Sequence, residues 1–155
     1  LSIQSNYKTV VDLVIGARRA IPEKPLHVYG IVGAATYLLM FYLGVDSVDS
    51  QGALLSGGAR QYYVPGKTDI HFRKLEGMGQ LPCSCEVCKN MAGQDLSFRE
   101  KIALHNFLTI QREISLIRQL IKEGSYEKYL KTRFNQKPVL KRAFQYAARK
   151  IKKIL

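Results

Sequence analysis

The chain has 155 residues, with 24 Lys or Arg against 12 Asp or Glu, which gives a formal net charge of +12. This length can bury one sizeable hydrophobic core, and the positive charge indicates a polyanionic partner, with a merely solvated basic surface as the alternative. No signal-peptide pattern and no apolar run long enough for a bilayer is found, so we expect a cytoplasmic protein without a membrane partner.

The first fifty residues alternate between helix and strand patterns. Apolar residues are dense from Lys8 to Ala20, which predicts a helix packed on a sheet, and Pro22 ends this helix. Residues 26–31 are typical of a short buried strand, residues 36–43 of a buried helix and residues 45–48 of a second strand. This order predicts a parallel sheet of the α/β class.

Two aspartates flank the end of the second predicted strand. Asp46 and Asp49 are three residues apart, so on a strand their side chains point to opposite faces. The carboxyl ends of parallel strands carry the chemistry of α/β proteins, which makes Asp49 a candidate nucleophile or general acid/base. Aspartate is also common where a strand enters a loop, and spacing alone leaves that alternative open. We interpret Asp46 as structural.

The region after Asp49 changes character. Serine and glycine dominate residues 50–58 and predict a loop. Residues 61–64 are expected to form a short edge strand, and residues 67–80 an irregular segment in which a β-hairpin is one option.

All three cysteines lie within six positions, and a histidine follows on the next predicted helix: Cys83, Cys85, Cys88 and His105. Three thiolates and one imidazole make a closed, tetrahedral structural zinc site. An odd number of cysteines leaves one thiol over in any disulfide scheme. We therefore predict a structural Zn²⁺ ion, with a reduced turn carrying chance cysteines as the alternative.

Three helices are expected in the last sixty residues. Ser97 and Glu100 form a capping-box pattern that opens a helix running to about Lys122, and Gly124 ends it. Its predicted buried face consists of Ala103, Phe107, Ile110, Ile114, Ile117 and Ile121.

The tail is strongly basic. A short helix capped by Ser125 is expected to reach Phe134, and Pro138 begins a last helix. Residues 137–153 contain seven Lys or Arg and no acid, which indicates a surface for phosphate backbones. An amphipathic helix on a membrane surface is the alternative.

Three motifs together resemble the C-terminal part of the tRNA-guanine transglycosylases, most closely the archaeal type: residues 44–50, residues 82–88 and residues 103–106, in this order. The resemblance covers about residues 7–135. It implies the C-terminal portion of a (β/α)₈ TIM-type barrel with a zinc-binding subdomain and C-terminal helices. Residues 1–70 would be the last two β/α units with an active-site loop, residues 71–124 the zinc-binding subdomain with its long helix, and residues 125–155 a basic helical tail.

The resemblance also implies an activity, that of a pentosyltransferase. Such enzymes replace guanine in tRNA by a 7-deazaguanine base, and Asp49 matches the nucleophile that forms a covalent glycosyl intermediate. Tyr29 and Gly30 match positions that approach the bound base. Cys83, Cys85, Cys88 and His105 match the ligands of a structural zinc ion.

The chain departs from the family pattern in two respects, and these departures leave alternative functions open. Two β/α units cannot close an eight-stranded barrel, so we expect the chain to need a missing barrel portion or a partner subunit, in a homodimer or heterodimer. Residues 57–66 resemble the branch that inserts 7-deazaguanines into DNA. The same chemistry on DNA therefore remains an alternative, as does a non-catalytic, zinc-containing accessory or nucleic-acid-binding subunit.

Overall fold

The computed structural model describes residues 3–31, 35–49, 51–66, 69–71, 83–89 and 96–152. The chain divides into two compact units. The first unit consists of residues 1–29, 35–48 and 119–155, and the second of residues 30–34 and 49–118. Helices predominate in the described part of the chain, and the strands form two small sheets.

The first unit contains the predicted parallel strand pair. Strand β1 (His27–Val28) pairs in parallel with β2 (Ser47–Val48), with His27 opposite Ser47 and Val28 opposite Val48. Helix α2 (Thr36–Tyr42) lies between them in the sequence, so the predicted order of strand, helix and parallel strand is confirmed. Each strand is shorter than the predicted segment, although the backbone N–H of Asp46 also donates across the pair, to the carbonyl oxygen of Leu26 at 2.9 Å.

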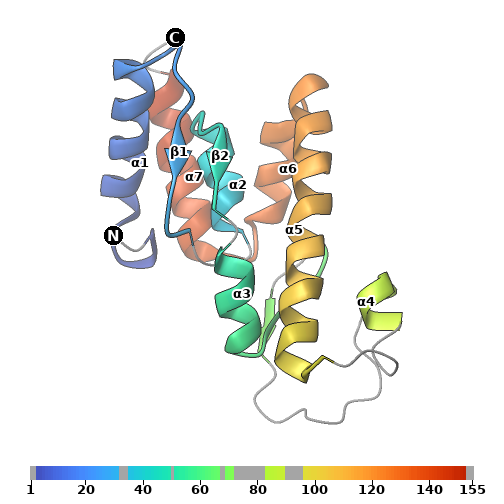
Figure 1. Ribbon diagram of the computed structural model, residues 1–155. Helices are drawn as coiled ribbons and strands as arrows, with labels where there is room; N and C mark the ends of the chain where they lie inside the picture. The colour runs from blue at the N-terminus through green and yellow to red at the C-terminus, as the bar shows by residue number, and fades with distance from the viewer. Residues whose placement is uncertain are drawn as a thin grey trace. The chain divides into compact units, whose positions relative to one another are not determined.

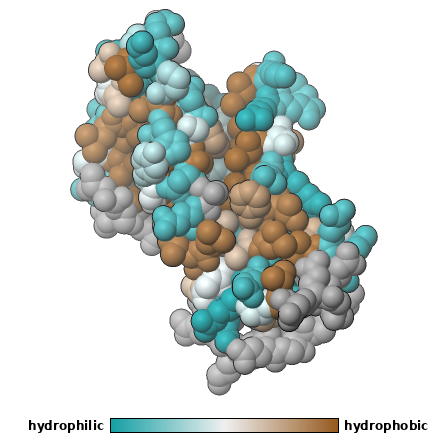
Figure 2. Space-filling model, in the orientation of Figure 1, coloured by the Kyte–Doolittle hydropathy of each residue, from teal (hydrophilic) through white to brown (hydrophobic). Residues whose placement is uncertain are grey.

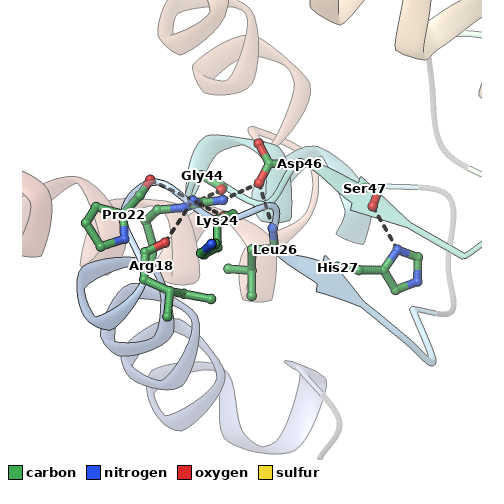
Figure 3. A network of polar contacts seen from close by, with 9 residues as sticks. Arg18, Pro22, Lys24, Leu26, His27, Gly44, Asp46 and Ser47 are labelled. Atoms are coloured by element: carbon green, nitrogen blue, oxygen red, sulfur yellow. Dashed lines mark hydrogen bonds and ion pairs between the residues drawn. The ribbon is translucent and has the colours of Figure 1, made fainter.

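A network around Arg18 fixes the entrance to both strands (Figure 3). Its guanidinium donates hydrogen bonds to the carbonyl oxygens of Gly44 (2.8 Å) and Lys24 (2.9 Å) and pairs with the carboxylate of Asp46. The same carboxylate accepts a hydrogen bond from the backbone N–H of Leu26 at 2.7 Å. Asp46 therefore ties the residues before β1 to those before β2, which supports its interpretation as structural.

Three further helices complete the first unit: α1 (Ile3–Ala20), α6 (Tyr126–Arg133) and α7 (Pro138–Lys152). Helix α1 lies beside α7, and α2 packs on both α6 and α7 (Figure 1). The core between them is apolar and fully or almost fully buried, and includes Val11, Leu38, Leu39, Met40, Leu130, Phe134, Ala143, Phe144 and Ala147. The predicted tail helices are thus packed against the N-terminal part of the chain.

One predicted cap differs from the structure. Ser125 stands at the N-cap position of α6, but its hydroxyl makes no capping bond to that helix. It donates instead to the carbonyl oxygen of Leu120 at 3.5 Å, near the end of the preceding helix. Gly124 has a φ of 68°, a conformation that glycine adopts without a steric penalty, and it ends that helix as predicted.

The second unit holds α3 (Gln51–Gly58), β3 (Gln61–Tyr63), β4 (Asp69–His71), α4 (Glu86–Lys89) and α5 (Phe98–Lys122). Strand β3 was predicted and is confirmed, and it pairs in antiparallel fashion with β4. The remainder of the expected irregular segment, residues 67–68 and 72–80, lies outside the described residues. The last turn of α5 belongs to the first unit.

The prediction of a loop over residues 50–58 was wrong, because residues 51–58 form helix α3. Gly57 in this helix allows close packing that a larger residue would block. A Cβ atom added at Gly57 would lie 2.5 Å from the Cβ of Ala103 and 2.6 Å from its Cα. Tertiary packing against α5 therefore outweighs the low helix propensity of this segment.

Helix α5 begins with the predicted capping box and differs from prediction in its buried face. The N–H of Ser97 donates to the Glu100 carboxylate at 2.7 Å, and the N–H of Glu100 donates to the Ser97 hydroxyl at 3.4 Å. Polar residues share the interior with apolar ones; the buried residues are Ile102, Ala103, His105, Asn106, Thr109, Glu113 and Ile117. Ile121, which was expected inside, is 51% exposed.

Part of the surface of the second unit is hydrophobic (Figure 2). Brown surface covers part of α3, where Leu54 and Leu55 are 63% and 52% exposed. No helix in the described part of the chain is both long and apolar enough to cross a membrane.

Candidate metal centre and catalytic aspartate

The four predicted metal ligands come together in the second unit. The sulfurs of Cys83, Cys85 and Cys88 and a ring nitrogen of His105 all lie within 4.8 Å of one another. Nδ1 of His105 is 3.4 Å from the Cys85 sulfur and 3.3 Å from the Cys88 sulfur. A tetrahedral zinc ion with its usual bond lengths separates a sulfur and a nitrogen ligand by about 3.6 Å. The donor set and its spacing therefore fit zinc.

The imidazole of His105 is held in the tautomer that a metal ligand needs. Its Nε2–H donates to the carbonyl oxygen of Tyr63 at 2.8 Å, and the hydroxyl of Thr109 lies 3.2 Å from the same nitrogen. Nδ1 therefore carries the free lone pair and faces the sulfurs. Burial lowers the pKa of His105, although the Tyr63 carbonyl opposes this shift, so the ring is neutral at pH 7.

The thiols themselves favour a bound cation. Burial raises the pKa of the Cys88 thiol to about 12, and its proximity to Cys85 contributes to the rise. For Cys85, burial also raises the pKa, but hydrogen bonds from the Cys88 backbone and side chain outweigh it and the net shift is downward. Adjacent buried thiolates repel one another, so the fully deprotonated set requires a positive charge at its centre.

Helix α4 and strand β3 position the ligands around α5. Cys85 precedes α4, Cys88 lies within it, and the backbone N–H of Cys85 points at the Cys83 sulfur at 3.4 Å. The amide of Asn106 clamps the strand to the helix: its Oδ1 accepts from the Tyr63 N–H at 2.9 Å, and its Nδ2 donates to the Gln61 carbonyl oxygen at 2.8 Å. Every atom of this side chain is buried.

Tyr62 is a component of the site that sequence reasoning missed. Its ring stacks on the imidazole of His105, with centroids 3.9 Å apart and planes 6° from parallel, and its hydroxyl lies 3.4 Å from the Cys88 sulfur. Burial and the neighbouring thiol of Cys88 raise the pKa of Tyr62, so the hydroxyl keeps its proton and can donate it to a thiolate. One indication of this residue was available in the sequence, its position in a predicted edge strand.

Asp49, the predicted nucleophile, directly follows β2 and precedes α3. Its carboxylate accepts hydrogen bonds from the backbone N–H of Gly30 and from the N–H of Gln51, the latter at 3.2 Å. Gly30 has a φ of 74°, a region that other residues avoid. Two amide donors restrict the carboxylate to one orientation.

A continuous set of contacts joins the metal ligands to the helix that follows Asp49. The hydroxyl of Tyr63 lies 2.7 Å from the Ser56 hydroxyl and donates to the Gly52 carbonyl oxygen at 3.2 Å, both in α3. The carbonyl oxygen of the same tyrosine accepts from His105. Tyr63 therefore couples the position of α3 to the metal centre.

The remaining predicted residue, Tyr29, follows β1 and is 81% exposed. Its ring meets the imidazole of His27 edge-on, with centroids 4.2 Å apart, and Nδ1 of His27 lies 2.8 Å from the Ser47 hydroxyl (Figure 3). The exposed ring is free to meet a planar ligand.

Sequence comparison places the chain in a known family. The family model described as queuine tRNA-ribosyltransferase matches residues 1–139. The chain belongs to this family, as the resemblance of its motifs had indicated.

Its relatives include archaeal enzymes named tRNA-guanine(15) transglycosylase. The chain is 33% identical over 146 residues to the protein of Pyrococcus furiosus, and this match covers 90% of this chain and 24% of the relative. It is 32% identical over 148 residues to the protein of Saccharolobus solfataricus, covering 90% of this chain and 28% of the relative. The Methanobrevibacter smithii protein is 34% identical over 148 residues, with 90% and 22% covered. The chain thus spans about a quarter of the length of the relatives it matches.

Proposed function

We propose that the chain contributes the nucleophile and a zinc-stiffened scaffold to a tRNA-guanine transglycosylase. The observation that carries this proposal is the carboxylate of Asp49, held by two backbone amides directly after β2 in a chain of this family. An oxygen of Asp49 forms a bond to C1′ of the target nucleoside while the bond from C1′ to guanine breaks and its electron pair leaves with the base. A 7-deazaguanine nitrogen then attacks C1′ and releases the carboxylate.

The target nucleotide has to leave its stack to reach Asp49, as in other enzymes that act on a base. In this proposal Tyr29 and Gly30 contact the base: the tyrosine offers an exposed ring, and the glycine has no side chain to obstruct the approach. The Gly30 N–H also orients the nucleophile.

Zinc in this proposal is structural. Four protein ligands, Cys83, Cys85, Cys88 and His105, would complete a tetrahedral shell and leave no position for a substrate. The ion would neutralise the thiolates and stabilise the contact between α4 and α5. Its effect on the reaction would pass through Tyr63 and α3 to Asp49.

The two parallel strands would be the last two of a (β/α)₈ barrel whose other strands lie outside this chain. The exposed leucines of α3 support this incompleteness, since exposed apolar patches usually mark a contact surface. The partner is the remaining barrel portion, in the same polypeptide or in another subunit, and it would supply the general base and the guanine pocket.

The test is base exchange by the chain combined with the remaining barrel, using radiolabelled guanine. We expect label to enter tRNA, Asp49→Asn to reduce the rate at least 10³-fold in order of magnitude, and Glu123→Gln, a carboxylate change on an exposed part of the chain, to leave it unchanged. Label in duplex DNA but not in tRNA would show the same chemistry on DNA, which the run from Gly57 to Gly66 favours. Exchange at the normal rate by Asp49→Asn would show that Asp49 is not the nucleophile. The chain would then have an accessory, non-catalytic role.

A further inference from the structure

The first unit has a pocket of about 300 Å³ between α1 and α7, lined by Lys8, Tyr146, Arg149 and Lys150. Both helices belong to the same compact unit and lie side by side (Figure 1). The volume is at the lower end of the range for ligand pockets, which leaves room for a phosphodiester group with parts of its sugars.

One wall of this pocket is an ordered cluster around Tyr146. The tyrosine hydroxyl donates to the carboxylate of Asp12 at 2.8 Å, and the ammonium group of Lys150 pairs with that carboxylate at 3.1 Å. The same ammonium lies 5.2 Å from the centroid of the Tyr146 ring. The ring of Tyr7 meets the Tyr146 ring edge-on, with centroids 6.3 Å apart. The Lys150 ammonium therefore lies over one face of the ring that lines the pocket.

The other two cations have no carboxylate partner among the residues that the structure describes. The Nε–H of Arg149 donates only to a carbonyl oxygen of its own helix, that of Gln145, at 3.3 Å, and Lys8 makes no ion pair in this part of the chain. Among the described residues, three cations line the pocket and the carboxylate of Asp12 pairs with one of them, Lys150, so the charge of this group is positive.

The position of Lys8 is unfavourable for the helix itself. Asn6 has non-helical backbone angles (φ −148°, ψ 54°) and its Oδ1 accepts from the Thr9 hydroxyl at 2.7 Å, so the regular part of α1 begins at Tyr7. Lys8 thus lies in the first turn, where the helix dipole favours an anion and disfavours a lysine. The basic residues at the end of α7 agree with the dipole, whereas Lys8 does not.

We propose that this pocket binds a backbone phosphate of the nucleic acid on which the enzyme acts, with Lys8 and Arg149 as the principal contacts. The inference rests on the proposed function only in taking nucleic acid as the polyanion. The phosphate contact of the basic tail would then lie at this pocket rather than along the whole length of α7.

The experiment compares two double variants of the full enzyme that remove equal charge. Lys8→Gln with Arg149→Gln empties the pocket of its unpaired cations, and Lys141→Gln with Arg142→Gln removes two exposed cations of the same helix outside the pocket. Binding of fluorescent tRNA is measured by anisotropy over a range of salt concentrations, and circular dichroism checks that both variants fold.

We expect the pocket variant to bind about tenfold or more weakly and to lower the slope of log Kd against log salt by about one to two, and the control variant to change affinity less than about threefold. Equal losses in the two variants, or no loss in the pocket variant, would overturn the proposal. Binding to phosphatidylserine vesicles that depends on Lys8 and Arg149, with tRNA binding unaffected, would also overturn it. Because binding is the readout, loss of the Asp49 mechanism in the exchange assay leaves this test intact.

Discussion

The ring of Tyr62 stacks on His105, and its hydroxyl is the only group that phenylalanine lacks. The contribution of this hydroxyl to zinc affinity can therefore be isolated by a single substitution. Tyr62→Phe keeps the ring on the imidazole and removes the hydroxyl that lies 3.4 Å from the Cys88 sulfur. Because groups that hydrogen-bond to metal ligands tune affinity, we expect zinc to bind about tenfold more weakly. Competition with a chromophoric chelator measures this change.

The control for that variant is Tyr126→Phe in the first unit, which loses a buried hydrogen bond of 2.7 Å to the carbonyl oxygen of Leu38. It should lower the stability of its own unit and leave zinc affinity unchanged. A loss of zinc affinity that is the same in both variants would mean that Tyr62 acts only through general stability.

The lowered pKa of Asp46 predicts a pH-dependent contribution to the free energy of unfolding. A hydrogen bond from the Leu26 N–H and the neighbouring Arg18 guanidinium hold the pKa of this carboxyl below its usual value. A lowered pKa in the folded state means that the carboxylate stabilises the fold above the unfolded value of about 3.9 and loses this contribution as the pH falls through the folded value.

Asp46→Asn should therefore be less stable than the wild type at pH 7, and the difference should shrink as the pH is lowered below about 4. The carboxylate is exposed, so the effect at neutral pH is expected to be small. Urea unfolding at several pH values measures it, and a difference that stays constant down to pH 3 would rule out the ion pair as its cause.

Among the helices, the contact of α3 with α5 depends on a single glycine. In Gly57→Ala the new methyl group would meet the Cβ, Cα and backbone N of Ala103 at 2.5–2.6 Å. Backbone atoms cannot rotate away, so we expect a loss of about 1–3 kcal/mol in the free energy of unfolding, measured with urea.

Gly58→Ala is the matched control, since a Cβ at this position has no neighbour within 4 Å. It should be neutral or slightly stabilising, because alanine favours a helix more than glycine does. Ala103→Gly should not rescue Gly57→Ala, because the backbone contacts remain. A destabilisation that is equal at both glycines would point to helix propensity or backbone freedom rather than packing.

This helix also shows where sequence reasoning fails. Helices with an apolar pattern or a capping box were predicted, because those signals are local, although α1 begins at Ile3 rather than at Lys8. Helix α3 was predicted as a loop, because the reason for Gly57 is its packing on Ala103, 46 positions away in the sequence.

The metal site divides in the same way. The four ligands could be predicted, because three of them are neighbours in the sequence and thiolate chemistry restricts their use. The residues that support them could not. Tyr62 and Tyr63 reach His105, and Asn106 reaches β3, only after the chain has folded across more than forty positions.

At the scale of the whole molecule, the metal centre should stiffen the second unit in particular. Removal of zinc with a chelator should increase amide hydrogen exchange in α4, in β3 and, through Tyr63, in α3. Exchange in α1 and α7, which belong to the other unit, should change little. Mass spectrometry of peptic peptides measures this pattern, and an equal increase in all helices would contradict the proposed path.

If Asp49 is the nucleophile, it becomes covalently attached to the nucleic acid, and the site of that attachment can be located. The chain, combined with the remaining barrel, is incubated with tRNA without an incoming base, quenched, digested and analysed by mass spectrometry. We expect a ribosyl adduct on the peptide that contains Asp49, and we expect it to be lost in Asp49→Asn. An adduct on a different carboxylate, with Asp49 unmodified, would contradict it.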